Sequence, residues 1–131
     1  MKKKKILLID DEKDFVYLLK SHLEHSGAYE VKTLLSAKDI LTHVHEFVPD
    51  VILLDLIMPE LGGIEACQML DRDPIGMSIP IIALSGLDKE VDKIQAYKCG
   101  IVDYIEKPVD FEVLVKAIEK SIKAKDEKDV S

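Results

Sequence analysis

The chain has 131 residues, 47% of them hydrophobic and 33% charged, and a formal net charge of −7. This length fits one soluble domain with a single sizeable core. The acidic balance argues against nucleic acid as a direct partner, because phosphate contacts need clustered Lys and Arg. No stretch is apolar enough for a signal peptide or a membrane span. Cys67 and Cys99 lack zinc or CxxC spacing, which favours reduced thiols in a cytoplasmic protein.

The first part of the chain alternates short apolar runs with apolar residues at helical spacing. Strands are predicted at residues 5–10 and 29–35, and each is followed by a helix. Asp11 or Asp14 is expected to cap the first helix, and Gly27 is expected to end it. The apolar positions expected on the buried faces are Phe15, Leu18, Leu19 and Leu23 in the first helix, and Ala37, Ile40, Leu41, Val44 and Val48 in the second.

A central strand is predicted at residues 51–55, where four apolar residues run directly into Asp55. An unbroken apolar run bounded by turn residues is typical of a strand buried on both faces. Residues 59–63 form the turn signal, and a third helix is predicted over 64–70. The strand would carry Asp55 to the carboxyl edge of the sheet, where ligands bind in open α/β folds.

The second part of the chain repeats the pattern twice. A fourth strand is predicted at 80–84, and a shorter, more polar one at 102–106 is expected at an edge of the sheet. Asp88 and Asp110 are expected to cap the helices that follow, and residues 125–131 are expected to fray. The apolar positions expected on the buried faces are Val91, Ile94 and Tyr97 in the fourth helix, and Phe111, Leu114, Val115, Ile118 and Ile122 in the fifth.

Five strand–helix repeats predict an α/β fold with a five-stranded, doubly wound parallel sheet and helices on both faces, in one domain over residues 1–131. Parallel strands end at the same edge of a sheet. The predicted strand ends therefore bring together three carboxylates, a hydroxyl and an ammonium group, which belong to Asp10, Asp11, Asp55, Ser85 and Lys107.

This set of groups predicts phosphoryl transfer. Neighbouring carboxylates repel one another and require a cation. Mg²⁺ prefers oxygen ligands, and we expect Asp10 and Asp11 to hold it. Lys107 would attract a phosphate as a fixed positive charge, and Ser85 would donate a hydrogen bond to it. Asp55 is the expected nucleophile, because a carboxylate can form an aspartyl phosphate.

Over essentially its whole length the sequence resembles the receiver domain of two-component response regulators. The resemblance is carried by Leu8-Ile9-Asp10-Asp11-Glu12, Asp55 to Pro59 with Gly62-Gly63, Leu84-Ser85-Gly86, and Gly100 to Lys107-Pro108. It implies a flavodoxin-like fold with strand order 2-1-3-4-5. It also implies a phosphoprotein of a phosphorelay, phosphorylated by a histidine kinase or a phosphotransfer protein. Such a protein is no enzyme beyond its own phosphorylation and dephosphorylation.

The resemblance also implies roles for the acidic residues. Asp55 matches the phosphoacceptor, and Asp10 and Asp11 match the acidic pair that binds magnesium. The carboxylate of Asp55 and the backbone carbonyl of Ile57 match the remaining protein ligands of that metal.

A second group of matching residues concerns the response to phosphorylation. Ser85 and Tyr104 match the switch pair of the family, and the bond before Pro108 matches a peptide bond that is typically cis. Phosphorylation would add a charge of about −1.5 to −2 at Asp55. Ser85 is then expected to move toward the phosphate, and Tyr104 to turn inward and remodel a partner-binding face.

Other functions are weaker readings of the same residues. A haloacid dehalogenase-type phosphatase has a second Asp two residues after its nucleophile, where this chain has Ile57. A flavodoxin-like cofactor binder would need phosphate donors in its first loop, where the acidic residues 10–12 would repel phosphate. A pseudo-receiver that only docks partners stays open. So do the downstream target, which is a separate protein or an output domain outside this sequence, and a phosphorylation-dependent dimer.

Overall fold

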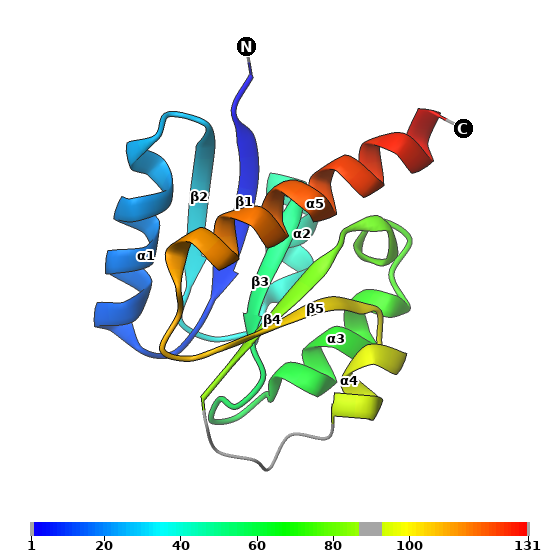
Figure 1. Ribbon diagram of the computed structural model, residues 1–131. Helices are drawn as coiled ribbons and strands as arrows, with labels where there is room; N and C mark the ends of the chain where they lie inside the picture. Colours follow the sequence, from blue (N-terminus) through cyan, green and yellow to red (C-terminus); the bar gives the residue numbers. More distant parts are fainter. Residues whose placement is uncertain (1, 87–92, 131) are drawn as a thin grey trace.

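The structure is built on five strands: β1 (Lys4–Ile9), β2 (Tyr29–Leu34), β3 (Val51–Asp55), β4 (Ile81–Ser85) and β5 (Ile101–Glu106). The computed structural model describes residues 2–86 and 93–130. All strand pairs are parallel, in the order β2-β1-β3-β4-β5 (Figure 1). The predicted fold class and strand order are confirmed, and β5 is an edge strand, as its polar composition indicated.

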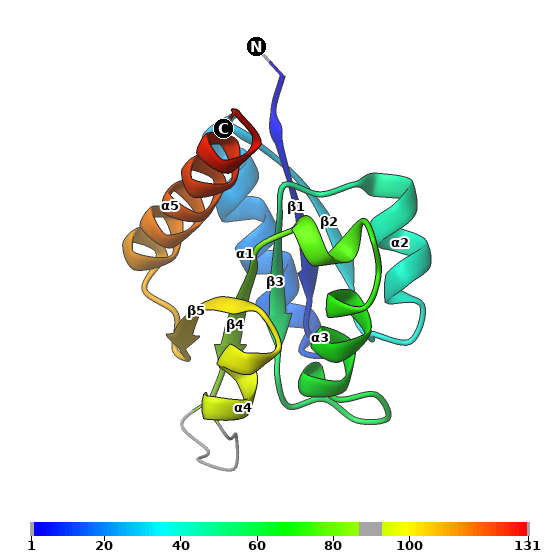
Figure 2. The same cartoon turned by 90° about the vertical axis from the view of Figure 1, so that its right-hand side faces the viewer.

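The described helices are α1 (Lys13–His25), α2 (Ile40–Phe47), α3 (Gly63–Asp71), α4 (Lys93–Lys98) and α5 (Phe111–Val130), with a short 3-10 helix at Gly76–Ser78. Helices α1 and α5 cover one face of the sheet, and α2, α3 and α4 cover the other (Figure 2). No helix within the described residues is both long and apolar enough to cross a bilayer.

The central strand explains why two helix layers form. Every residue of β3 is buried, and alternate side chains enter different cores because successive residues of a strand point to opposite faces. Leu53 packs with α1 and α5, whereas Ile52 and Leu54 pack with α2, α3 and α4. A strand that is apolar on both faces can be buried only between two layers of helices.

Some helix faces differ from those predicted. Three residues expected to be buried are largely exposed: Leu18 (56%), Val48 (51%) and Tyr97 (50%). Val48 is exposed because α2 ends before it, and it forms the C-cap in a left-handed conformation. Asp88 and Val91 lie outside the described residues, as does the side chain of Ile94.

The cap of α1 also differs from the prediction. Glu12 occupies the N-cap position, without a side-chain hydrogen bond to the helix, so the expected caps Asp11 and Asp14 are wrong. The side chain that binds the backbone before α1 is that of Asp10 and not Asp11, because Asp10 Oδ1 accepts the Glu12 N–H at 2.9 Å. This bond turns the chain at the end of β1 and orients one oxygen of the buried Asp10 carboxylate.

Helix α5 begins as predicted and ends later. The Asp110 carboxylate accepts hydrogen bonds from the N–H groups of Glu112 and Val113, which confirms it as the cap. The fraying expected for the tail is wrong for residues 125–130, which continue the helix. Their composition of Lys, Asp, Glu and Val lets the i to i−4 backbone bonds continue in solvent, and Lys4 Nζ contacts the Asp126 carboxylate at 3.5 Å.

Val48 provides a stability test of the α2 terminus. Its φ of 47° and ψ of 68° cost a β-branched residue about 1–2 kcal/mol. Its N–H still closes the helix by donating to the Val44 carbonyl at 2.8 Å. Because glycine adopts this conformation freely, Val48→Gly is expected to raise the free energy of unfolding by about 0.5–1 kcal/mol in urea titrations. Glu46→Gly, at an exposed position inside the same helix, should lower it by about 0.5–1 kcal/mol. A loss of stability in both variants would contradict the assignment of strain to Val48.

Candidate functional site

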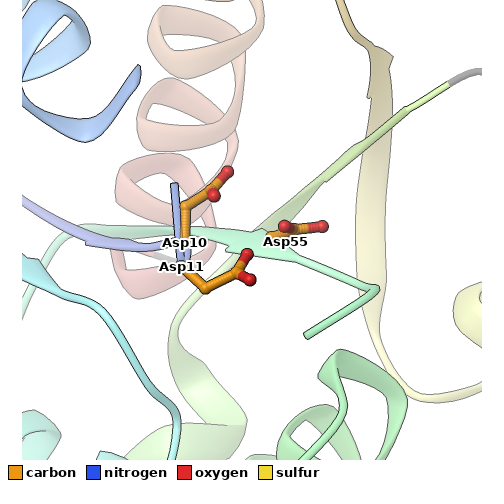
Figure 3. A group of neighbouring side chains, drawn as sticks. All are labelled: Asp10, Asp11 and Asp55. Atoms are coloured by element: carbon orange, nitrogen blue, oxygen red, sulfur yellow. The ribbon is translucent and has the colours of Figure 1, made fainter. Parts of the chain in front are cut away.

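Three carboxylates gather at the carboxyl edge of the sheet. Asp10 and Asp11 follow β1, and Asp55 is the last residue of β3; the pairing of Ile9 with Leu54 brings Asp10 level with Asp55. Figure 3 shows the three side chains together at this edge. One oxygen from each lies within 4.8 Å of the others. Asp10 and Asp55 are buried and Asp11 is exposed, so the cluster has one side open to solvent.

Lys107 is the cation of this site. It follows β5, and its Nζ lies 2.6 Å from Asp10 Oδ2, 2.9 Å from Glu12 Oε1 and 3.5 Å from Asp55 Oδ2. The Nζ also lies 4.6 Å from the centre of the Phe15 ring, within the range of a cation–π contact. In this arrangement the ammonium group is bound more closely to Asp10 and Glu12 than to Asp55.

The surroundings of Asp55 disfavour the ionised form of its carboxylate. The pKa of Asp55 is raised to about 6, chiefly by burial and also by the negative charges of Asp10 and Asp11. The Ile57 N–H, which donates to Asp55 Oδ1 at 3.0 Å, and the charge of Lys107 lower the pKa only in part. A neighbouring positive charge would therefore stabilise the ionised form of Asp55.

The surroundings of Lys107 favour its charged form, whereas those of Asp55 favour its neutral form. Burial alone would lower the pKa of Lys107, but hydrogen bonds to Asp10 and Glu12 and the charge of Asp55 more than offset it and raise this pKa above its usual value. Lys107 therefore carries its positive charge throughout the physiological pH range.

Ser85 and Tyr104 lie on the neighbouring strands, β4 and β5. Ser85 follows Leu84, which pairs with Asp55, so its buried side chain stands beside the acidic cluster. Its Oγ donates a long bond of 3.4 Å to the Gly86 carbonyl. Tyr104 is partly buried and packs against the apolar cluster of α2, α3 and α4. The switching role of Ser85 and Tyr104 stays a prediction.

The loop after β3 supplies the last expected groups. The Ile57 side chain is half-exposed, and its backbone N–H holds Asp55 as described above. The role of its carbonyl as a metal ligand stays a prediction. The peptide bond between Lys107 and Pro108 is cis, as the resemblance implied, and the Lys107 N–H donates to the Ser85 carbonyl at 2.7 Å.

Two residues at the site were missed as functional candidates. Glu12 and Phe15 both contact the Lys107 ammonium group from the start of α1. The sequence signal for Glu12 was its position directly after Asp10 and Asp11, at the same edge of the sheet as the predicted position of Lys107. Phe15 was assigned to the buried face of α1, and its apolar spacing gave no indication of a cation contact.

The arrangement can bind a hard cation and position a charged nucleophile. Three carboxylates offer the oxygen ligands that Mg²⁺ prefers, and a bound cation would favour the ionised form of the buried Asp55. A phosphoryl group on Asp55 would have Lys107 within reach to balance its charge.

Comparisons with known proteins identify the family of the chain. The family model for the response regulator receiver domain matches residues 6–119. The alkaline phosphatase synthesis transcriptional regulatory protein PhoP of Bacillus subtilis is 40% identical over 105 residues, which cover 80% of this chain and 42% of PhoP. Protein PilH of Pseudomonas aeruginosa is 36% identical over 114 residues, which cover 87% of this chain and 93% of PilH. The chain thus spans less than half of one relative and nearly all of the other.

Solved structures show the same architecture. A response regulator receiver domain protein from Clostridium thermocellum has a TM-score of 0.84 and 33% identity, covering 94% of this chain and 97% of that one. A CheY-like receiver domain protein from Methanospirillum hungatei has a TM-score of 0.88 and 23% identity, covering 97% and 99% of the two chains. At that identity the second likeness supports the fold alone.

Proposed function

The chain belongs to the response regulator receiver domain family of two-component signal transduction, and from this premise we propose that Asp55 accepts the phosphoryl group. The observation that carries this proposal is the convergence of Asp10, Asp11 and Lys107 on the Asp55 carboxylate. Asp10 and Asp55 both have oxygens near the other carboxylates and the ammonium group. Asp55, however, lacks the short ion pair that occupies Asp10.

The reaction transfers a phosphoryl group between two nucleophiles. An oxygen of ionised Asp55 attacks the phosphorus of a phosphohistidine on a histidine kinase or phosphotransfer protein. The phosphorus–oxygen bond forms as the phosphorus–nitrogen bond breaks, and the histidine leaves with the electron pair of that bond. The departing ring takes up one proton from solvent and becomes a neutral histidine, and the other product is an aspartyl phosphate. The partner must therefore bring its phosphohistidine to the open side of the acidic cluster.

Magnesium fits the donor set of the site. Asp10, Asp11 and Asp55 would hold the ion, together with the Ile57 carbonyl, and its positive charge would reduce the repulsion between the carboxylates and the incoming phosphoryl oxygens. This assignment is supported by the three oxygens within 4.8 Å and by the raised pKa of Asp55, which a cation would lower.

Lys107, Ser85 and Tyr104 would act after the transfer. The new phosphoryl oxygens draw Lys107 from its present ion pairs toward Asp55, a shift that starts from 3.5 Å. Ser85 would turn its hydroxyl from the Gly86 carbonyl to a phosphoryl oxygen, since its present hydrogen bond is weak at 3.4 Å. Tyr104 would then move into the vacated space and change the surface near β5, which is where a downstream partner would detect phosphorylation.

The proposal is tested by phosphorylation of the purified chain. Incubation with acetyl phosphate and Mg²⁺ is expected to give one acid-stable, base-labile adduct, seen by intact-mass spectrometry as a single added phosphoryl group. Asp55→Asn should give none, because an amide oxygen does not attack phosphorus at a useful rate. Chelation of Mg²⁺ should abolish the adduct in the unaltered chain.

A matched control distinguishes loss of the phosphorylation site from loss of one negative charge. Glu30→Gln removes the same charge at an exposed position of β2 and should be phosphorylated as fast as the unaltered chain. An adduct that persists at full yield in Asp55→Asn would place the acceptor elsewhere and overturn the proposal.

A further inference from the structure

Two cysteines lie against each other between α3 and α4. Cys67 is in the middle of α3, and Cys99 directly follows α4. Both belong to the same apolar cluster, and neither is joined in a disulfide. The Cys67 thiol donates to the Cys99 carbonyl, with the sulfur 3.0 Å from the oxygen, and the Cys99 side chain is near enough to raise the pKa of the Cys67 thiol. Cys99 precedes β5, whereas Lys107 follows it, so the pair lies near the opposite end of that strand from Lys107.

We propose that Cys67 and Cys99 form a redox modification site, in which a hydroperoxide converts the two thiols to an intramolecular disulfide. A disulfide needs β-carbons about 3.5–4.5 Å apart and sulfurs that can close to about 2.05 Å. The Cys67 sulfur already lies 3.0 Å from the Cys99 carbonyl oxygen, so the two residues are neighbours and the remaining approach of the sulfurs is short. Disulfides of this kind in proteins with otherwise reduced thiols are commonly transient and regulatory.

The oxidant can reach one of the two thiols. Cys99 is slightly exposed, whereas Cys67 has no exposed surface. Cys99 lines a pocket of about 280 Å³, together with Gln68, Asp71, Arg72 and Lys98. This space holds several water-sized molecules, so hydrogen peroxide can enter it. Cys99 is therefore the thiol that reacts first.

Disulfide formation then takes place in two steps. The Cys99 sulfur attacks one peroxide oxygen, the oxygen–oxygen bond breaks, and the products are a sulfenic acid and one water. The Cys67 sulfur next attacks the Cys99 sulfur, the sulfur–oxygen bond breaks, and hydroxide leaves as a second water with the Cys67 proton. Two thiols lose two electrons and two hydrogens, and one peroxide is reduced. A small dithiol reverses the change.

The environment of Cys67 supports this order of events. Burial, first, and the neighbouring Cys99, second, raise the pKa of the Cys67 thiol well above its usual value. A thiol of this kind reacts poorly with an external oxidant, because the thiolate is the nucleophile. It reacts with Cys99 because the Cys67 sulfur is already in contact with that residue, which replaces a bimolecular encounter by an intramolecular one.

The disulfide would join the end of α4 to the middle of α3. It closes a loop of about 30 residues, and cross-links of this length restrict the unfolded chain enough to raise the melting temperature on the order of 10 °C in a domain of this size. The same link would limit displacement of α4 relative to α3, without altering any group in contact with Asp55.

The test exposes the full, folded chain to hydrogen peroxide, removes the excess and measures intact mass. The expected product has lost two hydrogen atoms, has no free thiol after denaturation, runs as a monomer without reductant and yields one cross-linked peptide pair containing Cys67 and Cys99. Dithiothreitol should restore the starting mass, and the melting temperature should fall back with it.

Single variants test the two roles. Under the same exposure Cys99→Ala should keep its Cys67 thiol free, whereas Cys67→Ala should stop at a Cys99 sulfenic acid that dimedone traps. The unaltered chain decides the proposal even if a variant folds poorly. Two free thiols after exposure, a mass increased by oxygen atoms, or disulfides formed only between separate chains would each overturn it.

Discussion

Asp55→Asn is expected to raise the free energy of unfolding by up to about 3 kcal/mol at pH 8 in the absence of divalent cations. The pKa of Asp55 is about 6 in the folded chain, against an ordinary value of 3.8, and each unit of difference corresponds to about 1.4 kcal/mol. The ionised carboxylate is therefore unfavourable in the folded state. Asparagine removes the charge and can still accept the Ile57 N–H with its side-chain oxygen.

The sign of the pH dependence follows from the direction of that shift. Between pH 3.8 and about 6 the folded chain binds the Asp55 proton more tightly than the unfolded chain. The stability that protonation contributes is therefore fully present below the unfolded pKa and is lost as the pH rises through the folded pKa. The advantage of Asp55→Asn should be largest above pH 6 and should vanish near pH 4.

Urea titrations at several pH values, with a chelator present, measure this effect. Glu30→Gln makes the same charge change at an exposed position and should alter the stability by less than about 0.5 kcal/mol. Adding Mg²⁺ should reduce the advantage of Asp55→Asn, because a cation bound at the cluster favours the ionised carboxylate. An Asp55→Asn variant that is no more stable at pH 8 than at pH 4, relative to the unaltered chain, would contradict the electrostatic description of the site.

Gly63→Ala is expected to lower the free energy of unfolding by about 3 kcal/mol or more and to slow phosphorylation. A β-carbon at Gly63 would lie 2.4 Å from both the Asp55 carbonyl oxygen and the Leu56 α-carbon. These are backbone atoms, so relief requires movement of α3 or of the end of β3 rather than a rotamer change. The second movement would displace the proposed phosphoacceptor from the acidic cluster.

The neighbouring glycine is the matched control for this steric argument. A β-carbon at Gly62 would lie 3.9 Å from Glu65 Oε1 and 4.0 Å from the Leu56 carbonyl oxygen, which are ordinary contacts. Gly62→Ala should therefore cost no more than about 1 kcal/mol, mainly through the weaker N-cap, and should be phosphorylated normally. Thermal or urea unfolding and the rate of acetyl phosphate labelling distinguish the two variants. Equal losses in both would exclude the close approach of Gly63 to β3 as the cause.

The sheet and the acidic cluster could be predicted because their signals are local. Four apolar residues before Asp55, and an apolar run before Asp10, identify strands buried on both faces. Once the strands are parallel, their carboxyl ends must meet at one edge. The positions of the carboxylates then follow from chain connectivity, without knowledge of side-chain packing.

Helix faces and termini were less predictable because the spacing of apolar residues is compatible with more than one buried face and more than one helix end. Leu18 fits an apolar helical repeat, yet packing against the sheet selects other positions of α1 and leaves it exposed. Val48 also fits such a repeat, but α2 ends before it. The α5 tail was expected to fray from its polarity, which describes solvent exposure and not the ability of the backbone to stay helical.

By itself, the sequence determined the order of strands and helices, the burial of the central strand and the meeting of Asp10, Asp11, Asp55 and Lys107 at one edge. Only the tertiary structure decided how Lys107 divides its contacts, with Asp10 and Glu12 closer than Asp55, and that the two cysteines are in contact. Both depend on distances of a few ångströms between segments far apart in the chain, and such distances are set by the packing of whole helices on the sheet.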